Sequence, residues 1–194
     1  MKTFLIAALA FFIATVAHAG QKASVGSLRA QVPVEMVTAV ISVEGETKDD
    51  FLRRAAGLLE GYTDRTGFEA CASVCQSPTR TGVYITSSQA HAYCAAIDRC
   101  PLSDMTNTGE TIHSHPQEER YVVNQNDAIF SNFRHKRGER RNGDPDRFSD
   151  LDYDGGSGYL VTRGELRYQQ GRGQERVIGP TIKPEESILA SIVR

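Results

Sequence analysis

Four cysteines limit the ways in which the middle of this chain can fold: Cys71, Cys75, Cys94 and Cys100. The first two lie in the segment 68–75, "FEACASVC", which is typical of a β-strand. On a strand, side chains four positions apart share a face but lie roughly 13 Å apart, which is too far for a disulfide between Cys71 and Cys75. We therefore expect Cys94 and Cys100 either to bond to each other or each to reach back to this strand.

The N-terminus has the pattern of a secretory signal peptide over residues 1–19. Lys2 is followed by an apolar run at 4–16 and then by Ala17-His18-Ala19, a cleavage site of the small-x-small type before Gly20. The run is too short for a comfortable transmembrane helix, although a membrane anchor is the alternative. We predict a mature protein that is periplasmic or secreted and has no membrane span. In such a protein, four cysteines favour disulfides over a zinc cluster, for which their spacing is poor.

Composition is ordinary for one globular domain. The formal net charge is −2 and charged residues make up 24% of the chain, so no general attraction to nucleic acid or to anionic membranes is indicated. The residues that follow the predicted signal peptide suffice for a single domain with a sizeable core. We expect no nucleic-acid partner.

Hydrophobic spacing predicts a helix between Thr47 and Gly67. Thr47 and Asp50 have the spacing of a capping box, apolar residues then recur at helical intervals, and Gly67 ends the pattern. Further elements are expected at 33–44 (a strand, with a helix as the alternative), 68–75 and 82–87 (strands), 88–97 (helix), 110–116 (strand), around 123–133 (helix), 159–162 and 165–169 (a hairpin) and 175–178 (strand).

The order of these elements predicts an α/β fold, a mixed-sheet α-β-α sandwich in a single domain. We expect residues 20–46 to form an N-terminal segment, loose over 20–32, and residues 47–194 to form the domain. Residues 117–148 form a long polar insertion that contains the basic run "RHKRGERR" at 134–141. Residues 144–158, rich in turn-forming residues, are expected to be a loop.

The segment "TIHSHP" at 111–116 carries the first candidate ligands. His113 and His115 alternate on a predicted strand, so both would face the same side and could share one metal ion. The alternative is that each is a hydrogen-bonded core or rim residue. A hydrolytic zinc site needs a third protein ligand and one open position.

The segment "FSDLDYD" at 148–154 offers that third ligand. It contains Ser149, Asp150, Asp152 and Asp154 in a polar, glycine-flanked context. Such residues also cap helices or stay solvated. A calcium loop is a further alternative, but the glutamate that closes an EF-hand loop is absent.

A general base is also required, and Glu69 is the best candidate. It stands at the entry of the apolar strand 68–75, where a carboxylate is costly unless it has a partner. Glu60 fits the exposed face of the predicted helix. Glu110 lies three positions before His113, so its side chain would project to the opposite face of that strand.

Taken together, Glu69, "HSHP" at 113–116 and "SDLD" at 149–152 resemble the JAMM motif of the JAB/MPN-domain metalloproteases. The similarity extends over roughly residues 50–180, because "EACASV" and "GYLVTRGELRYQQ" resemble strands of that family. It implies the JAB/MPN (cytidine-deaminase-like) fold in an exported, bacterial-type member.

The resemblance also implies roles for single residues. His113, His115 and Asp152 would bind zinc (Zn2+). Glu69 would act as general acid and base, and Ser149 would hydrogen-bond the reacting water or the developing oxyanion. The reaction implied is zinc-dependent hydrolysis of an amide or isopeptide bond by an exported peptidase or amidase.

The insertion at 117–148 departs from the family pattern, in which HxH and SxxD are separated by a short gap. It could be a lid, a binding arm for an acidic partner, or a solvated loop. The export signal points to a peptide or protein substrate of the cell envelope, for instance a peptidoglycan stem peptide. The alternatives are a non-catalytic binding module of the same fold and a secreted effector or toxin hydrolase.

Overall fold

A computed structural model describes residues 21–25 and 30–184. The predicted signal peptide at 1–19 lies outside the described residues. Among the residues described, no helix is both long enough and apolar enough to cross a membrane.

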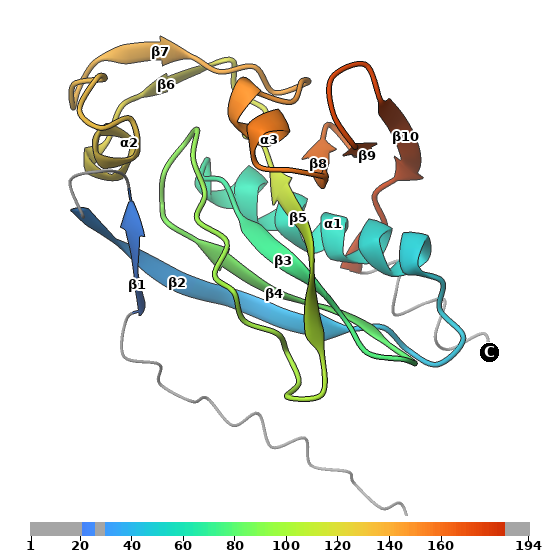
Figure 1. Ribbon diagram of the computed structural model, residues 1–194. Helices are drawn as coiled ribbons and strands as arrows, with labels where there is room; N and C mark the ends of the chain where they lie inside the picture. Colours follow the sequence, from blue (N-terminus) through green and yellow to red (C-terminus); the bar gives the residue numbers. More distant parts are fainter. Residues whose placement is uncertain (1–20, 26–29, 185–194) are drawn as a thin grey trace, which may run out of the picture.

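One mixed sheet of eight strands forms the centre of the molecule (Figure 1). Its spatial order is β1 (Gln21–Val25), β2 (Ala30–Ile41), β4 (Thr81–Ser87), β3 (Cys71–Gln76), β5 (Thr106–Ser114), β8 (Gly158–Thr162), β9 (Glu165–Gln169) and β10 (Glu175–Pro180). All neighbours are antiparallel except β5 and β8, which are parallel. A separate ribbon pairs β6 (Arg120–Val122) with β7 (Arg140–Asn142). The predicted α/β class and single domain are confirmed.

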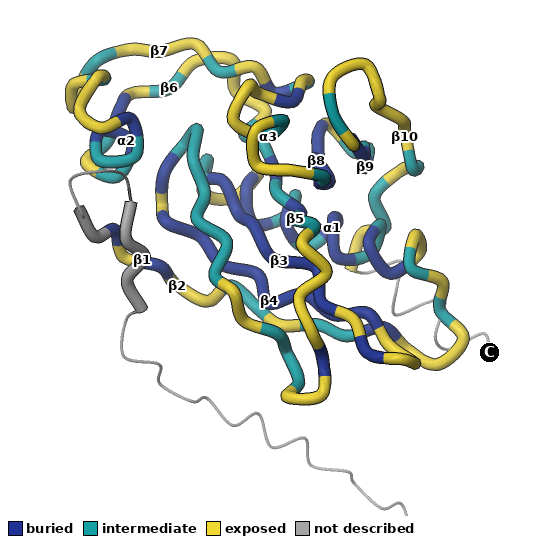
Figure 2. Tube along the Cα trace, viewed as in Figure 1, coloured by how far each residue is buried: buried dark blue, intermediate teal, exposed yellow. Residues whose placement is uncertain are grey.

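Helix α1 (Lys48–Thr66) covers one face of this sheet, as predicted. Thr47 caps its N-terminus by accepting a hydrogen bond from the Asp50 amide at 3.2 Å. Gly67 ends it with φ 73°, a left-handed conformation that glycine adopts without a steric penalty. The apolar face of the helix packs on the sheet in one core, which includes Phe51, Leu52, Leu59, Val74, Val83, Ile85 and Ile112. Figure 2 shows β3 and β4 as a nearly continuous buried run beneath the helix.

The opposite face of β3 and β4 is covered by residues 88–105, and the helix predicted at 88–97 is absent. Two disulfides tie this segment to β3: Cys71–Cys94 and Cys75–Cys100. The second sequence-based alternative, in which each later cysteine reaches back to the strand, is therefore confirmed. Side chains of the sheet also bond to the segment's carbonyls, as Thr86 does to Ala95. We attribute the loss of the helix to these tertiary ties, which override local helix propensity.

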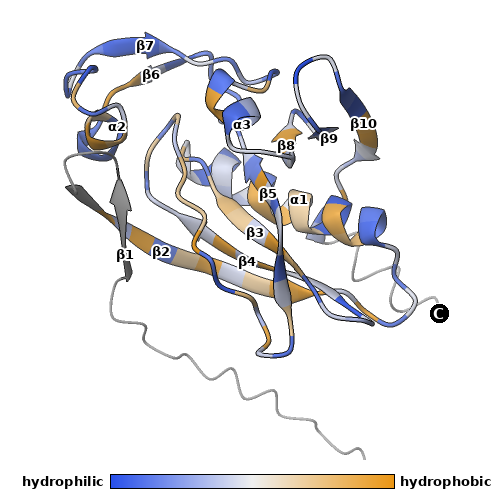
Figure 3. Ribbon diagram, in the orientation of Figure 1, coloured by the Kyte–Doolittle hydropathy of each residue, from blue (hydrophilic) through white to orange (hydrophobic). Residues whose placement is uncertain are grey.

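Three other expectations need correction or refinement. Residues 20–32 were expected to be loose, but β1 and the start of β2 form a regular antiparallel pair. Residues 144–158 were expected to be a loop, but they contain helix α3 (Asp150–Asp154). The helix predicted near 123–133 is present as α2 (Gln125–Phe130), and the hairpin β8–β9 and strand β10 are also present. Figure 3 shows that the insertion elements around β7 are mainly hydrophilic.

The two glycines in the middle of α1 give a matched test of packing. A methyl group at Gly57 would overlap the backbone of Ile182, whereas one at Gly61 would meet only the flexible end of Arg65 at 3.4 Å. Alanine favours a helix by about 1 kcal/mol over glycine, and overpacking typically costs about 1–3 kcal/mol. We expect Gly57→Ala to lower the free energy of unfolding and Gly61→Ala to raise it, as measured by urea denaturation. Equal effects at the two positions would contradict the close crossing at Gly57.

The disulfides should contribute substantially to stability. Each closes a loop, with sequence separations of 23 and 25 residues, and such a bridge is typically worth ~2–4 kcal/mol. In a chain of this size, each kcal/mol shifts the melting temperature by about 2–4 °C. We therefore expect the variant Cys75→Ala with Cys100→Ala to melt about 5–15 °C lower by circular dichroism. An unchanged melting temperature, with two free thiols detected in the unaltered protein, would contradict this bridge.

Candidate metal centre

The pairing of β3 with β5 brings the candidate residues onto one face. Cys71 is directly opposite His113 in the antiparallel register, and the Ser114 amide donates to the Ala70 carbonyl at 3.0 Å. Ser114 points toward α1, where its hydroxyl lies 2.6 Å from that of Thr63. Because strand side chains alternate, His113 points to the opposite face. The face that carries His113 is the one covered by the disulfide-linked segment 88–105.

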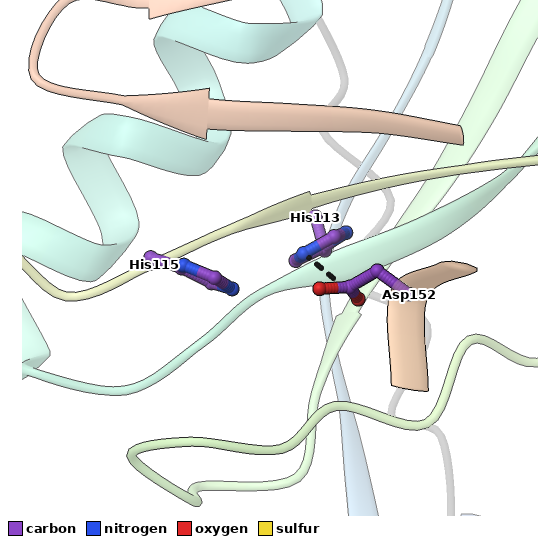
Figure 4. Close-up of side chains that lie close together, drawn as sticks. All are labelled: His113, His115 and Asp152. Atoms are coloured by element: carbon purple, nitrogen blue, oxygen red, sulfur yellow. Dashed lines mark ion pairs between the residues drawn. The ribbon is translucent and has the colours of Figure 1, made fainter. Parts of the chain in front are cut away.

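His113, His115 and Asp152 converge on one point (Figure 4). Three potential ligand atoms, one from each residue, lie within 4.8 Å of one another. His113 Nε2 and Asp152 Oδ1 are 3.3 Å apart. His113 lies at the end of β5, His115 follows directly after the strand, and Asp152 comes from α3. The three residues could hold a metal ion, as the histidine spacing and the resemblance to the JAMM motif implied.

The Asp152 carboxylate is oriented by the start of its own helix. Ser149 is the N-cap of α3, and the two residues form a capping box: the Ser149 amide donates to Asp152 Oδ2 at 2.6 Å. In return, Ser149 Oγ accepts from the Asp152 amide at 3.4 Å. Oδ2 is thus engaged, while Oδ1 faces His113. The Ser-x-x-Asp spacing is a helix-capping pattern in this chain as well as a candidate ligand motif.

A second hydrogen bond orients His115. Its Nδ1 lies 2.9 Å from the Asp144 carbonyl oxygen. Because a carbonyl can only accept, Nδ1 carries the proton and the lone pair of the neutral ring is at Nε2. A carbonyl that holds the distal nitrogen is the usual support for a metal-binding histidine.

His113 Nε2 is the observation that best fits a cation. It is fully buried, and it has no hydrogen-bond partner among the described residues, since Asp152 lies close without hydrogen-bond geometry. Buried polar atoms are nearly always paired, so an orphaned nitrogen beside a carboxylate suggests a missing ligand. In tetrahedral zinc sites, bonds of about 2.0–2.1 Å place neighbouring ligand atoms about 3.4 Å apart. The His113–Asp152 distance matches this value.

Both histidines are held in the form that binds metals. Burial lowers the pKa of His113, opposed by the charge of Asp152. Burial, followed by the charge of His113, lowers the pKa of His115 to about 4. The two imidazoles are therefore neutral at neutral pH, and a neutral imidazole has the lone pair that a metal requires.

Glu69 lies beside this cluster. Its carboxylate Oε1 is 3.8 Å from His115 Nε2, and the side chain is only 7% exposed. Burial raises its pKa well above the ordinary range, and the charges of Asp152 and Asp127 raise it further. The raised pKa of Glu69 and the lowered pKa of His115 both favour the neutral forms of this pair. A bound cation would favour the carboxylate form instead.

The rival glutamates are engaged elsewhere, on the side of α1. Glu110 pairs with Lys48 and accepts from Tyr168 at 3.1 Å. Glu60 accepts from the Gly164 amide at 2.6 Å and from the Thr181 hydroxyl at 2.7 Å. Of the three glutamates considered, only Glu69 adjoins the metal cluster.

The candidate centre opens into a cavity of about 750 Å³. The insertion at 117–148 supplies much of the lining, which includes His135 and Arg141 of the basic run, together with Ser149 beside Asp152. The calcium-loop alternative does not fit, because Asp150 pairs with Arg172 at 2.8 Å and lies on the helix. The predicted contact of Ser149 with water or an oxyanion stays a prediction.

Sequence reasoning missed the other wall of this cavity. His91, Tyr93 and Tyr121 line it, and the buried Asp127 holds His91. The sequence did contain one signal, the capping-box spacing of Asn124 and Asp127, which resembles that of Ser149 and Asp152. His91 was assigned to a helix that is absent, so its direction could not be inferred.

Comparisons with protein-family models, with curated proteins and with solved structures found no match to this chain. The assignment of a metal site to these residues therefore rests on their geometry alone.

Asp152 and Asp150 give a matched test of the cluster, since both lie on α3 but only Asp152 faces the histidines. We expect the chain to take up about one zinc ion, the stoichiometry of a three-ligand site. Asp152→Asn should weaken zinc binding at least about tenfold, because it removes the charged ligand, while Asp150→Asn should leave it unchanged. Calorimetric titration of the mature protein measures both. Little zinc uptake by the unaltered chain would contradict the assignment.

Proposed function

We propose that the protein is an exported zinc-dependent peptidase or amidase of the JAMM type, with a JAB/MPN-like fold, acting on an amide or isopeptide bond. The observation that carries this proposal is the buried Glu69 carboxylate beside the cluster of His113, His115 and Asp152. A metal-binding module without catalysis has no need of a buried carboxylate at that place. The cost of burying it suggests a chemical role.

In this proposal, His113 Nε2, His115 Nε2 and Asp152 Oδ1 hold the metal. Zinc, when bound, acidifies a water molecule and polarises the carbonyl of the scissile bond. Glu69 receives the proton of the attacking water at its carboxylate and passes it to the nitrogen of the leaving amine. The water oxygen bonds to the carbonyl carbon, the C–N bond breaks, and Glu69 returns to its starting state.

The surroundings of Glu69 support this use. Its backbone is fixed on both sides, since its amide donates to the Ala90 carbonyl at 2.9 Å and its own carbonyl accepts from the Ser87 hydroxyl at 2.8 Å. No hydrogen bond to its carboxylate is found among the described residues, so the carboxylate is free to exchange protons. Burial raises its pKa, which makes its carboxylate a stronger base toward the attacking water.

The proposed location is the periplasm or the exterior of the cell. Two disulfides are typical of proteins from oxidising compartments. The proposed substrate is accordingly a peptide or protein of the envelope, with a peptidoglycan stem peptide as the first case to test.

Glu69 and Glu118 line the same cavity, which allows a controlled test of the base. We expect zinc-loaded Glu69→Gln to lose hydrolysis by at least about a hundredfold, the usual scale of general acid–base catalysis, while it keeps its zinc. Glu118→Gln should remain active. The measurement is mass spectrometry of products from stem peptides and from an N-acylated peptide library. Hydrolysis that is unchanged in Glu69→Gln would exclude Glu69 as the base.

A further inference from the structure

The wall of the cavity formed by the segment 88–105 and the insertion is rich in hydrogen-bond donors. His91 and Tyr93 belong to the disulfide-linked segment, and Tyr121 and Arg141 belong to the β6–β7 ribbon. Glu69 and the metal cluster line the same cavity. None of these four side chains had a role in the proposed reaction.

His91 is held as rigidly as the metal ligands. Asp127, whose side chain is fully buried, accepts hydrogen bonds from the His91 amide at 2.7 Å and from Nδ1 at 2.8 Å. The ring also stacks on Tyr121, with centroids 5.2 Å apart, and meets the edge of Phe68 at 4.9 Å. Because Nδ1 carries the proton that Asp127 accepts, Nε2 of the neutral ring is an acceptor, so the role of His91 here is to position Tyr121.

Three donors, Tyr93, Tyr121 and Arg141, line the same cavity as this ring. Tyr121 and Arg141 are directly opposite each other in the antiparallel β6–β7 pair, so their side chains share a face. Tyr93 stacks on Phe130 with an interplanar angle of 7°. Neither tyrosine hydroxyl has a hydrogen-bond partner among the described residues. Burial raises the pKa of both phenols, that of Tyr121 to about 12, so each stays protonated and able to donate.

Arg141 is available to a ligand. Its one ion pair among the described residues is with Glu139, at 3.5 Å, and both side chains are more than a third exposed. Such exposed pairs contribute little and exchange readily. Asp127 does not compete for Arg141, because its oxygens are taken by His91 and by the Asn124 amide. The wall thus presents two phenol hydroxyls and one guanidinium as donors.

We propose that Tyr93, Tyr121 and Arg141, with His91 packed against Tyr121, form a carboxylate-binding subsite that faces the metal centre. This inference rests on the proposed function and deepens it: the substrate is a short peptide or amino-acid conjugate with a carboxylate near the bond that is cut. A guanidinium and phenol donors match a carboxylate, whose oxygens only accept. The cavity volume of about 750 Å³ suits a ligand of a few residues and not a folded protein.

The subsite can be tested without knowing the substrate. Hydroxamates bind zinc, so a series with two to six methylenes between the hydroxamate and a terminal carboxylate is compared with matched terminal carboxamides. With the zinc-loaded protein, we expect the acid to bind roughly ten- to a hundredfold tighter than its amide at one chain length, the range for one charged hydrogen bond. Calorimetry measures both. Equal binding of acid and amide at every length overturns the proposal.

Single substitutions then identify the residue that causes the preference for the acid over the amide. Arg141→Gln should abolish the preference for the acid, and Tyr121→Phe should reduce it. Arg137→Gln is the matched control, because Arg137 belongs to the same basic run but does not line the cavity. A preference that survives in Arg141→Gln, with melting curves unchanged, would assign the carboxylate to another group.

An error in the assignment of the subsite can be distinguished from an error in the assignment of the metal centre. If the chain takes up no zinc, the same comparison uses N-acetyl-dialanine and its amide on the metal-free protein, observed by saturation-transfer NMR. A stronger signal for the acid that is lost in Arg141→Gln supports the subsite and leaves only the zinc peptidase in error. Equal signals overturn the subsite.

Discussion

The antiparallel pairing of β3 with β5 is the constraint on which the rest depends. With Cys71 opposite His113, the even alternation of strand side chains places Cys71, Glu69, His113 and His115 on one face. A slip of β5 by one residue would turn His113 and His115 toward α1, away from Cys71 and Glu69. The Ser114 hydroxyl, held between Thr63 and the Ala70 amide, helps to fix that register from the other side. The β3–β5 pairing therefore positions the hydrophobic core, the Cys71–Cys94 disulfide and the residues of the candidate metal site.

The same local motif, a helix capping box, occurs twice at the edge of the cavity. Ser149 with Asp152 and Asn124 with Asp127 are both capping boxes, and in each the aspartate accepts from its own N-cap amide and lies beside a histidine. Asp152 faces His113 across 3.3 Å, and Asp127 binds His91 through two hydrogen bonds. A short helix start thus holds a carboxylate at little entropic cost, because its side chain is already fixed by the cap.

The strand pairing and the helix caps explain which parts of the fold and of the site could be predicted from the sequence. Helix α1 and most of the strands were predictable because their hydrophobic period and their caps are local signals. Strand alternation placed His113 and His115 together, and the resemblance to the JAMM motif added Asp152; the convergence of the three is confirmed. The segment 88–97 was predicted as a helix from its local propensity. Its actual path is set by the Cys71–Cys94 disulfide and by the hydrogen bond from Thr86 to the Ala95 carbonyl, and these contacts with distant residues cannot be inferred from the segment itself. The zinc identity and the JAB/MPN family stay predictions, since the geometry bears on neither directly.

The two walls of the cavity are built from different kinds of structure. One carries the residues of the proposed reaction, and the other carries the residues proposed to bind the substrate. Glu69, His113 and His115 project from the paired ends of β3 and β5, where backbone hydrogen bonds fix their positions. The opposing donors come from an irregular segment and from the β6–β7 ribbon, which are held by Cys71–Cys94 and by the Asp127–His91 contact. Changes of sequence in the insertion can therefore alter the charge and shape that meet a substrate without disturbing the register of the sheet. Under the proposed function, the insertion at 117–148 is the part of the chain that would meet the substrate.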